Sequence, residues 1–256
     1  MKGHVKHIVL IQSLQNERLT GTELYEDCIR RRIDFQGLDF THVFYNVDTK
    51  DKLIELLRHY GNIANYYENG LVLHLEMHGD KELKGLVLSN GQLISWLELV
   101  DLFRVINIGT CNNLYITMAT CNGREIYTAV DPHQKSPYAA YVSASMTVDN
   151  SQIAEAFFRL FDNLLDSGNL ITAYLNMERI GSNFYYKDSK TTFEEGFNDT
   201  MQRLYGDENL KAEIVADASK AAQKATGFKA SAEFENMVFE TALKDIFKKH
   251  YDAFQF

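Results

Sequence analysis

The sequence predicts an α/β fold with a mostly parallel central sheet, helices on both faces and a helical C-terminal extension. Strand-like and helix-like patterns alternate through most of the chain, as expected where crossover helices join parallel strands. The length of 256 residues, with 45% hydrophobic and 24% charged residues, is ample for a globular α/β domain. Beyond residue 189 only helix-like patterns remain, which predicts the extension.

The N-terminal half contains three predicted strands of apolar residues. They cover residues 7–14, 40–47 and 70–77, and helices are predicted over residues 22–33 and 50–67. The third strand is apolar almost without alternation, which is typical of a strand with helices on both sides. The second helix begins after Asp48 or Thr49, one of which is its expected N-cap.

The next segments continue this rhythm. Residues 83–96 carry Asn90-Gly91 between two apolar runs, which predicts a β-hairpin. A helix over 97–107 leads to a strand over 114–120. A further strand, 138–148, precedes an amphipathic helix, with Asn150 or Ser151 as its expected cap and the range 151–168.

The remainder is predicted to be helical. It divides into segments 191–206, 208–227 and 232–254, and the last segment has apolar residues at helix spacing: Phe234, Met237, Val238, Ala242 and Ile246. We therefore expect a domain over 1–188 and a helical extension over 189–256 that packs on it.

Composition excludes several classes of protein. The formal net charge of -9, with no basic stripe, argues against nucleic-acid binding. The N-terminal apolar run of about six residues is too short for a signal peptide or membrane span, so we expect a cytoplasmic protein without membrane contact. Three cysteines without a CxxC pair suit neither a disulfide framework nor structural zinc. No Gly-rich phosphate loop or Gly-x-Ser-x-Gly elbow is present, and no cofactor is expected.

Two predicted strands end in residues that can carry chemistry. The strand in "LVLHLEMHGD" stops at His78-Gly79, and the strand before "CNG" stops at Cys121-Asn122-Gly123. Ligands and catalytic groups collect at the carboxyl ends of parallel strands. A thiol and an imidazole are therefore expected to meet at this edge of the sheet.

Other residues of the same types have simpler interpretations. Cys111 precedes its strand, on the order of 20 Å from that edge, and is expected to be structural, while Cys28 is expected to be a small core residue. A metal site of the form His74-x-Glu76-x-His78 is disfavoured, because i and i+4 on a straight strand stand about 13 Å apart. Glu76 is instead expected to pair with a basic group or with His74.

The order and spacing of these strand ends resemble the caspase-like cysteine peptidases of clan CD, which include caspases, metacaspases, separase and bacterial CHAT domains. A His-Gly closes one core strand and Ala119-x-Cys121-x-Gly123 closes the next, 121 − 78 = 43 residues later. Residues 138–175 also resemble the CHAT pattern of strand, Val-Asp and two helices, so CHAT-type domains are the nearest in pattern. The resemblance covers roughly residues 7–180 and implies a three-layer caspase-like fold.

The sequence departs from these families in places. Ala119 and Thr120 stand where metacaspases have an acidic residue, so their basic specificity is not supported. Residues 145–147 lack the tryptophan usual in CHAT domains. The connection 122–137 is short for a linker cut during activation, which favours a single-chain enzyme.

The resemblance implies a cysteine endopeptidase with a protein or peptide substrate, such as a regulated bacterial protease. It makes Cys121 the nucleophile, His78 the general acid/base, and the amides of Gly79 and Cys121 the oxyanion hole. Two loops would wall the specificity pocket, where Glu17 or Asp149 could accept a basic side chain and Arg18 an acidic one. Asp149 is equally interpreted as a helix cap.

Two alternatives stay open at this stage. The first is a catalytically inactive caspase-like module for interaction or regulation, and the second is another α/β hydrolase or ligand-binding protein. The C-terminal helices are expected to be either a docking surface for an activating or regulatory protein or a solvated helical cap.

Overall fold

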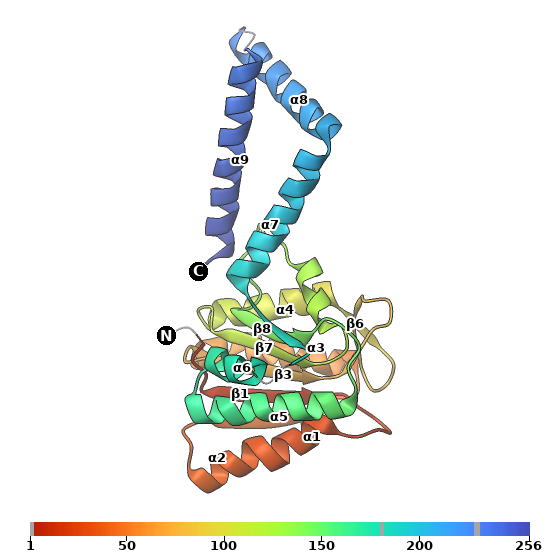
Figure 1. Ribbon diagram of the computed structural model, residues 1–256. Helices are drawn as coiled ribbons and strands as arrows, with labels where there is room; N and C mark the ends of the chain where they lie inside the picture. The colour runs from red at the N-terminus through yellow and green to blue at the C-terminus, as the bar shows by residue number, and fades with distance from the viewer. Residues whose placement is uncertain (1–2, 180–181, 228–230) are drawn as a thin grey trace. The chain divides into compact units, whose positions relative to one another are not determined.

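A six-stranded sheet forms the centre of the first part of the chain in the computed structural model, which describes residues 3–179, 182–227 and 231–256 (Figure 1). The strand order is β2-β1-β3-β7-β8-β9, and the first five strands are parallel, whereas β9 is antiparallel to β8. The predicted fold class is confirmed. The strands are β1 (His7–Gln12), β2 (Thr41–Asn46), β3 (Leu71–Glu76), β7 (Leu114–Ala119), β8 (Ala140–Ala144) and β9 (Phe184–Asp188).

One face of the sheet is covered by helices near both ends of the domain sequence. Ile8 and Leu10 of β1 point into this core, where Phe157 and Phe161 are almost fully buried. Truncating either phenylalanine to alanine would cost about 3–5 kcal/mol. The elements here are α1 (Thr20–Leu24), the π-helical turn η1 (Tyr25–Arg30), α2 (Arg31–Gln36), α5 (Asn150–Ser167) and α6 (Leu170–Glu178).

The opposite face forms a second core. Val9 and Ile11 alternate with their neighbours on β1 and pack here, so both faces of the strand are buried. Thr49 caps α3 by accepting from the amide of Lys52, which confirms one of the two expected caps. The elements on this face are α3 (Lys50–Asn62), the 3₁₀ turn η2 (Ala64–Tyr67), α4 (Trp96–Gly109) and the 3₁₀ helix η3 (Gly123–Ala129).

A separate three-stranded antiparallel sheet lies between β3 and α4 in the chain. It consists of β4 (His78–Gly79), β5 (Gly85–Val87) and β6 (Leu93–Ser95). Its β5–β6 pair is the hairpin predicted from Asn90-Gly91, and Gly91 takes the positive φ of 83° that the turn requires. Strand β9 was not predicted, because it is only five residues long and most of its residues are polar or aromatic.

The helical region contains the three helices that the sequence predicted, with bounds that differ by at most two residues. It consists of α7 (Ser189–Gly206), α8 (Glu208–Thr226) and α9 (Ala232–Phe254). The chain divides into two compact units, residues 1–131 with 136–189, and residues 132–135 with 190–256. Packing of the extension on the sheet domain stays a prediction. Within the described part of the chain, no helix is both long and apolar enough to cross a membrane.

Helix α9 packs through a different face from the one its sequence pattern suggests. Phe234, Met237, Val238 and Ile246, which stand at helix spacing, are all exposed. Aromatic rings on another face of α9 meet rings of α7 instead, and the centroids of Phe197 and Phe247 lie 4.5 Å apart. The aromatic cluster outweighs the regular apolar pattern because several large rings pack together there and bury more apolar surface. The cluster comprises Phe193, Phe197, Phe247, Tyr251 and Phe254.

Candidate active site

His78 lies where the chain leaves the central sheet. Strand β3 ends at Glu76, the buried Met77 makes the turn, and His78 pairs with Val87 in the small sheet. The His78 side chain is 57% exposed, and its Nε2 lies 2.6 Å from Oε1 of Glu17. The sequence pattern suggested that His78 continues the face of β3 that carries His74. The structure shows that it does not, because His78 belongs to the small sheet.

Cys121 follows β7, the strand beside β3. Its sulfur is half-buried and donates to the backbone carbonyl of Val148, 3.7 Å away, in the loop that leads to α5. The next residue, Asn122, has a left-handed backbone with φ of 54°, and its amide donates to the carbonyl of Met146. The loop between β8 and α5 thus holds the Cys121 turn in place.

Gly79 connects these two strand ends. A Cβ on this residue would lie 2.0 Å from the carbonyl oxygen of Cys121, far closer than any real contact. The backbone of Gly79 therefore touches the backbone of Cys121, and only glycine allows the approach. The imidazole and the thiol themselves are not hydrogen-bonded to each other in the described structure, since each bonds to another partner.

The three residues expected in a specificity pocket are each engaged by a neighbour. Glu17 bonds to His78, and Arg18 donates to both carboxylate oxygens of Glu23. Asp149 is the N-cap of α5, where it accepts from the amides of Ser151 and Gln152. This confirms the interpretation of Asp149 as a helix cap, whereas the cap expected at Asn150 or Ser151 is wrong, because the helix begins one residue earlier. Contact of Glu17, Arg18 or Asp149 with a substrate stays a prediction.

A pocket of about 430 Å³, here called the α1–α5 groove, begins at Arg18 and runs between the first turns of these helices. Leu24 and Phe158 supply apolar surface, and the ion pairs Arg18–Glu23 and Glu155–Arg159 stand at its sides. Asp27 also lines the groove and has no ion-pair partner among the described residues. Neither His78 nor Cys121 lines the groove. The loop after β1, which contacts His78 through Glu17, and the loop before α5, which contacts Cys121 through Val148, both lead into it.

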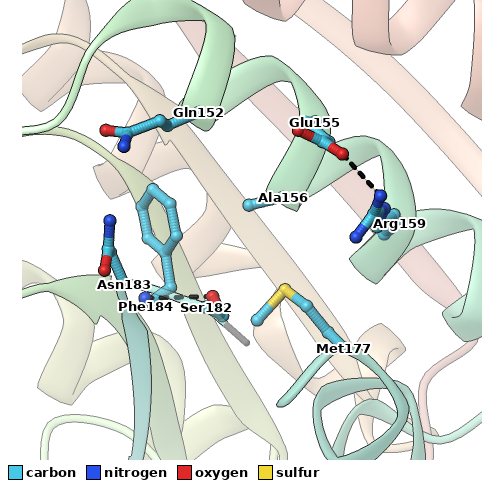
Figure 2. Close-up of a pocket in the computed structure, with 8 residues that line it drawn as sticks. All are labelled: Gln152, Glu155, Ala156, Arg159, Met177, Ser182, Asn183 and Phe184. Atoms are coloured by element: carbon cyan, nitrogen blue, oxygen red, sulfur yellow. Dashed lines mark hydrogen bonds and ion pairs between the residues drawn. The ribbon is translucent and has the colours of Figure 1, made fainter. Parts of the chain in front are cut away.

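A second pocket, of about 390 Å³, lies on the other side of α5 (Figure 2). Figure 2 shows the ring of Phe184 beside the amides of Gln152 and Asn183, with the Glu155–Arg159 pair on the next turn of the helix. The first turns of α5 therefore border both pockets. This pocket's carboxylate, Glu155, is paired with Arg159, its hydroxyl, Ser182, accepts from the amide of Phe184, and neither His78 nor Cys121 lines it.

The remaining cysteines and the candidate metal ligands are now placed. Cys28 is fully buried in the core, as predicted, and burial raises its pKa to about 12. Cys111 precedes β7, but it is exposed and not a structural thiol of the interior. His74 Nε2 lies 3.1 Å from Oε1 of Glu76, which confirms the predicted pairing. No group of three potential metal ligands occurs among the residues that the structure describes.

Comparison with known proteins identifies the fold. The crystal structure of the Drosophila initiator caspase Dronc matches with a TM-score of 0.52 and 16% sequence identity, over 73% of this chain and 82% of that chain. This chain has a caspase-like fold. No protein-family model matches the sequence, and no curated protein matches it. The comparison supports a caspase-like fold and does not single out CHAT-type domains.

Proposed function

We propose that the chain is a cysteine endopeptidase whose nucleophile is Cys121 and whose general acid/base is His78. The observation that carries the proposal is the contact between Gly79 and the carbonyl of Cys121 in a caspase-like sheet. This contact brings the ends of β3 and β7 together, so a thiol and an imidazole leave one sheet edge from adjoining backbone positions. A peptide bond laid across that edge would be within reach of both groups.

The hydrogen bond to Glu17 supports different roles for the two nitrogens of His78. An ionised carboxylate only accepts hydrogen bonds, so Nε2 carries a proton toward Glu17 and Nδ1 is the free base in the neutral ring. In the proposed reaction Nδ1 takes the proton of the Cys121 thiol, and the sulfur attacks the carbonyl carbon of the substrate. The imidazolium then protonates the leaving amine as the C–N bond breaks, and water hydrolyses the thioester.

Gly79 is the proposed donor to the developing oxyanion. The amide of Asp80 donates to Gly85, and hydrogen bonding alternates along an antiparallel ladder. The amide of Gly79 therefore points away from β5 and is available to a ligand. The amide of Cys121 would be the second donor, as the resemblance implies.

The α1–α5 groove is the proposed site for a substrate side chain. The opposite charges within each of its two ion pairs cancel. The groove therefore has a net negative charge from the Asp27 carboxylate. An acidic side chain would be disfavoured there, whereas an apolar or basic one would fit the walls of Leu24 and Phe158.

The test is cleavage of a fluorogenic peptide library by the wild-type chain, by Cys121→Ala and by the matched control Cys111→Ala. Cys111 is exposed and precedes β7, so its loss should leave cleavage unchanged. Cys121→Ala should abolish cleavage, because no other thiol occupies this sheet edge. Equal cleavage by wild type and Cys121→Ala would remove the enzyme hypothesis.

A second candidate function is an inactive caspase-like interaction module. It is favoured by the separate engagement of the two groups, with the thiol on Val148 and the imidazole on Glu17. In that case iodoacetamide would alkylate Cys121 no faster than a model thiol near neutral pH. Faster alkylation that is lost in His78→Ala would favour the peptidase.

Regulation and location also belong to the proposal. The exposed apolar residues of α9, among them Phe234 and Met237, offer a surface for an activating or regulatory protein, as in a regulated bacterial protease of CHAT type. All three cysteines are free thiols, which fits a reducing compartment such as the cytoplasm.

A further inference from the structure

A buried polar network lies directly beneath the candidate active site. Its centre is Glu76, the last residue of β3, whose side chain is only 2% exposed. One carboxylate oxygen bonds to Nε2 of His74, and the other accepts from the hydroxyl of Thr20 at 2.8 Å. On the next strand, Thr117 lies 2.8 Å from Nδ1 of His74. Both oxygens of a buried carboxylate are thus satisfied, which a stable interior requires.

Packing fixes this network in one arrangement. The rings of Phe157 and Phe161, both from α5, lie 4.7 and 5.1 Å from the ring of His74 and cover it. His74 and Thr117 are register partners on adjoining strands, so their bond crosses the sheet at its centre. The only member that is not on the sheet is Thr20, the first residue of α1.

The first turn of α1 is pressed against the ends of two strands. A Cβ on Gly21 would lie 2.8 Å from Cγ of Glu76 and 2.9 Å from Oε1 of Gln12, so glycine is required for this approach. Gln12 also accepts from the amide of Thr22 at 2.9 Å. Gln12 and Glu76 are register partners at the ends of β1 and β3, and together they hold the start of the helix.

Two short segments of chain connect the Thr20–Glu76 bond to the Glu17–His78 bond. Thr20 follows Glu17 by three residues, and His78 follows Glu76 by two. The bonds Thr20–Glu76 and Glu17–His78 therefore close a small ring of chain between the loop 13–19 and the turn after β3. If the first bond is released, the loop gains freedom and Glu17 no longer stays beside the imidazole.

We infer that Glu76 and Thr20 are positioning residues: their buried hydrogen bond fixes the loop that holds Glu17 against Nε2 of His78. The inference rests on the proposed function, because it assigns this loop a role in orienting the general base. Neither residue touches the reacting atoms. Both act through Glu17, so their effect on the reaction should vanish in a variant that lacks the Glu17 carboxylate.

Thr20→Val is the informative variant, since it keeps the shape of the side chain and removes only the donor. Replacement of Glu76 itself could unfold the chain. Thr20→Ser restores the hydroxyl and is the rescue variant. Thr110→Val is the matched control, because Thr110 is also a fully buried donor but bonds to Asn107 at the end of α4.

Two measurements decide the inference, the first of which needs no substrate. Hydrogen exchange should rise in residues 13–24 of Thr20→Val and stay at the wild-type level there in Thr20→Ser and Thr110→Val. In addition, for a fluorogenic peptide selected by wild-type cleavage, Thr20→Val should lower kcat/KM about tenfold in the wild-type background but less than about twofold in Glu17→Gln. A purely structural role would reduce both backgrounds equally.

The possible failures are distinguishable. Unchanged exchange in residues 13–24, or equal effects of Thr20→Val in the two backgrounds, would overturn the positioning role. If the wild-type chain cleaves no peptide, the proposed function fails, and the exchange measurement alone still decides whether the Thr20–Glu76 bond holds the loop.

Discussion

Nε2 of His78 lies 2.6 Å from Oε1 of Glu17, although the two residues are 61 positions apart in sequence. Glu17 comes from the loop after β1, and His78 begins the small sheet after β3. In a Cys-His site, a carboxylate at this position sets which ring nitrogen carries the proton. If His78 is the general base, as proposed, this contact would let Glu17 orient it, and the predicted specificity role of Glu17 stays a prediction.

Glu17→Gln is expected to lower kcat/KM about 10- to 100-fold, because the amide can donate to Nε2 and favour the tautomer with Nδ1 protonated. The effect should be smaller than for a buried triad, since His78 is 57% exposed and water can replace the carboxylate. Steady-state cleavage of a library-selected peptide measures it. Glu55→Gln, at an exposed position of α3 on the opposite face of the sheet, is the control and should leave kcat/KM unchanged.

Gly79→Ala is expected to lower kcat/KM at least about a hundredfold, by displacing a donor to the oxyanion. The new Cβ would meet the carbonyl of Cys121 at 2.0 Å, so one of the two backbones must move. The same strain should lower the free energy of unfolding by about 1–3 kcal/mol.

Gly196→Ala in α7 provides the comparison, because a Cβ there has no atom within 4 Å. It should leave cleavage unchanged and raise helix stability by about 0.5–1 kcal/mol. Urea unfolding and peptide cleavage of both variants are the measurements. Full activity in Gly79→Ala would exclude this amide from the reaction.

The three thiols should differ in their reaction with iodoacetamide. Burial raises the pKa of Cys28 to about 12, so almost none of it is thiolate at about pH 8. We expect the exposed Cys111 and the half-buried Cys121 to be alkylated first, as followed by peptide mapping. In urea, where burial is lost, Cys28 should react at a rate similar to that of Cys111. Equal rates in the folded chain would contradict the buried position of Cys28.

Much of the sheet was predictable because the patterns that specify its strands are formed by residues close to one another in the sequence. The apolar runs of β1, β3 and β7, the Asn90-Gly91 hairpin and the His74–Glu76 pair depend on residues that are close in sequence or on neighbouring strands. The meeting of the two strand ends followed from the parallel arrangement alone, since carboxyl ends share one edge.

The partners of these strand ends were not predictable from pattern. The bond between Glu17 and His78 depends on the path of a seven-residue loop, which no periodicity records. The loop is set by the contact of Thr20 with Glu76, and that contact is visible only after α1 has been placed on the sheet. Short polar loops have many conformations of similar energy, so tertiary contacts select among them.

The acid sensitivity of the fold should include a contribution from Glu98 at the start of α4. Its carboxylate accepts from Lys50 and from the backbone and hydroxyl of Ser95, and chiefly the bond from Lys50 lowers its pKa to about 2. Because the pKa is lower in the folded chain, this stabilisation is complete above the ordinary value of 4.5 and is lost as the pH falls toward 2. The side chain is 43% exposed, so solvent screening keeps the contribution at about 1 kcal/mol or less.

Glu98→Gln should therefore be less stable than the wild type at about pH 6, and the difference should shrink at about pH 3, where the wild-type carboxylate begins to protonate. Urea unfolding at the two pH values measures the free energy of unfolding. Glu55→Gln, at an exposed position of α3 without an ion-pair partner in the described structure, is the control and should show no such pH-dependent difference. A constant difference for Glu98→Gln would mean that the cap acts through shape and neutral hydrogen bonds, because only a charge interaction weakens as the carboxylate protonates.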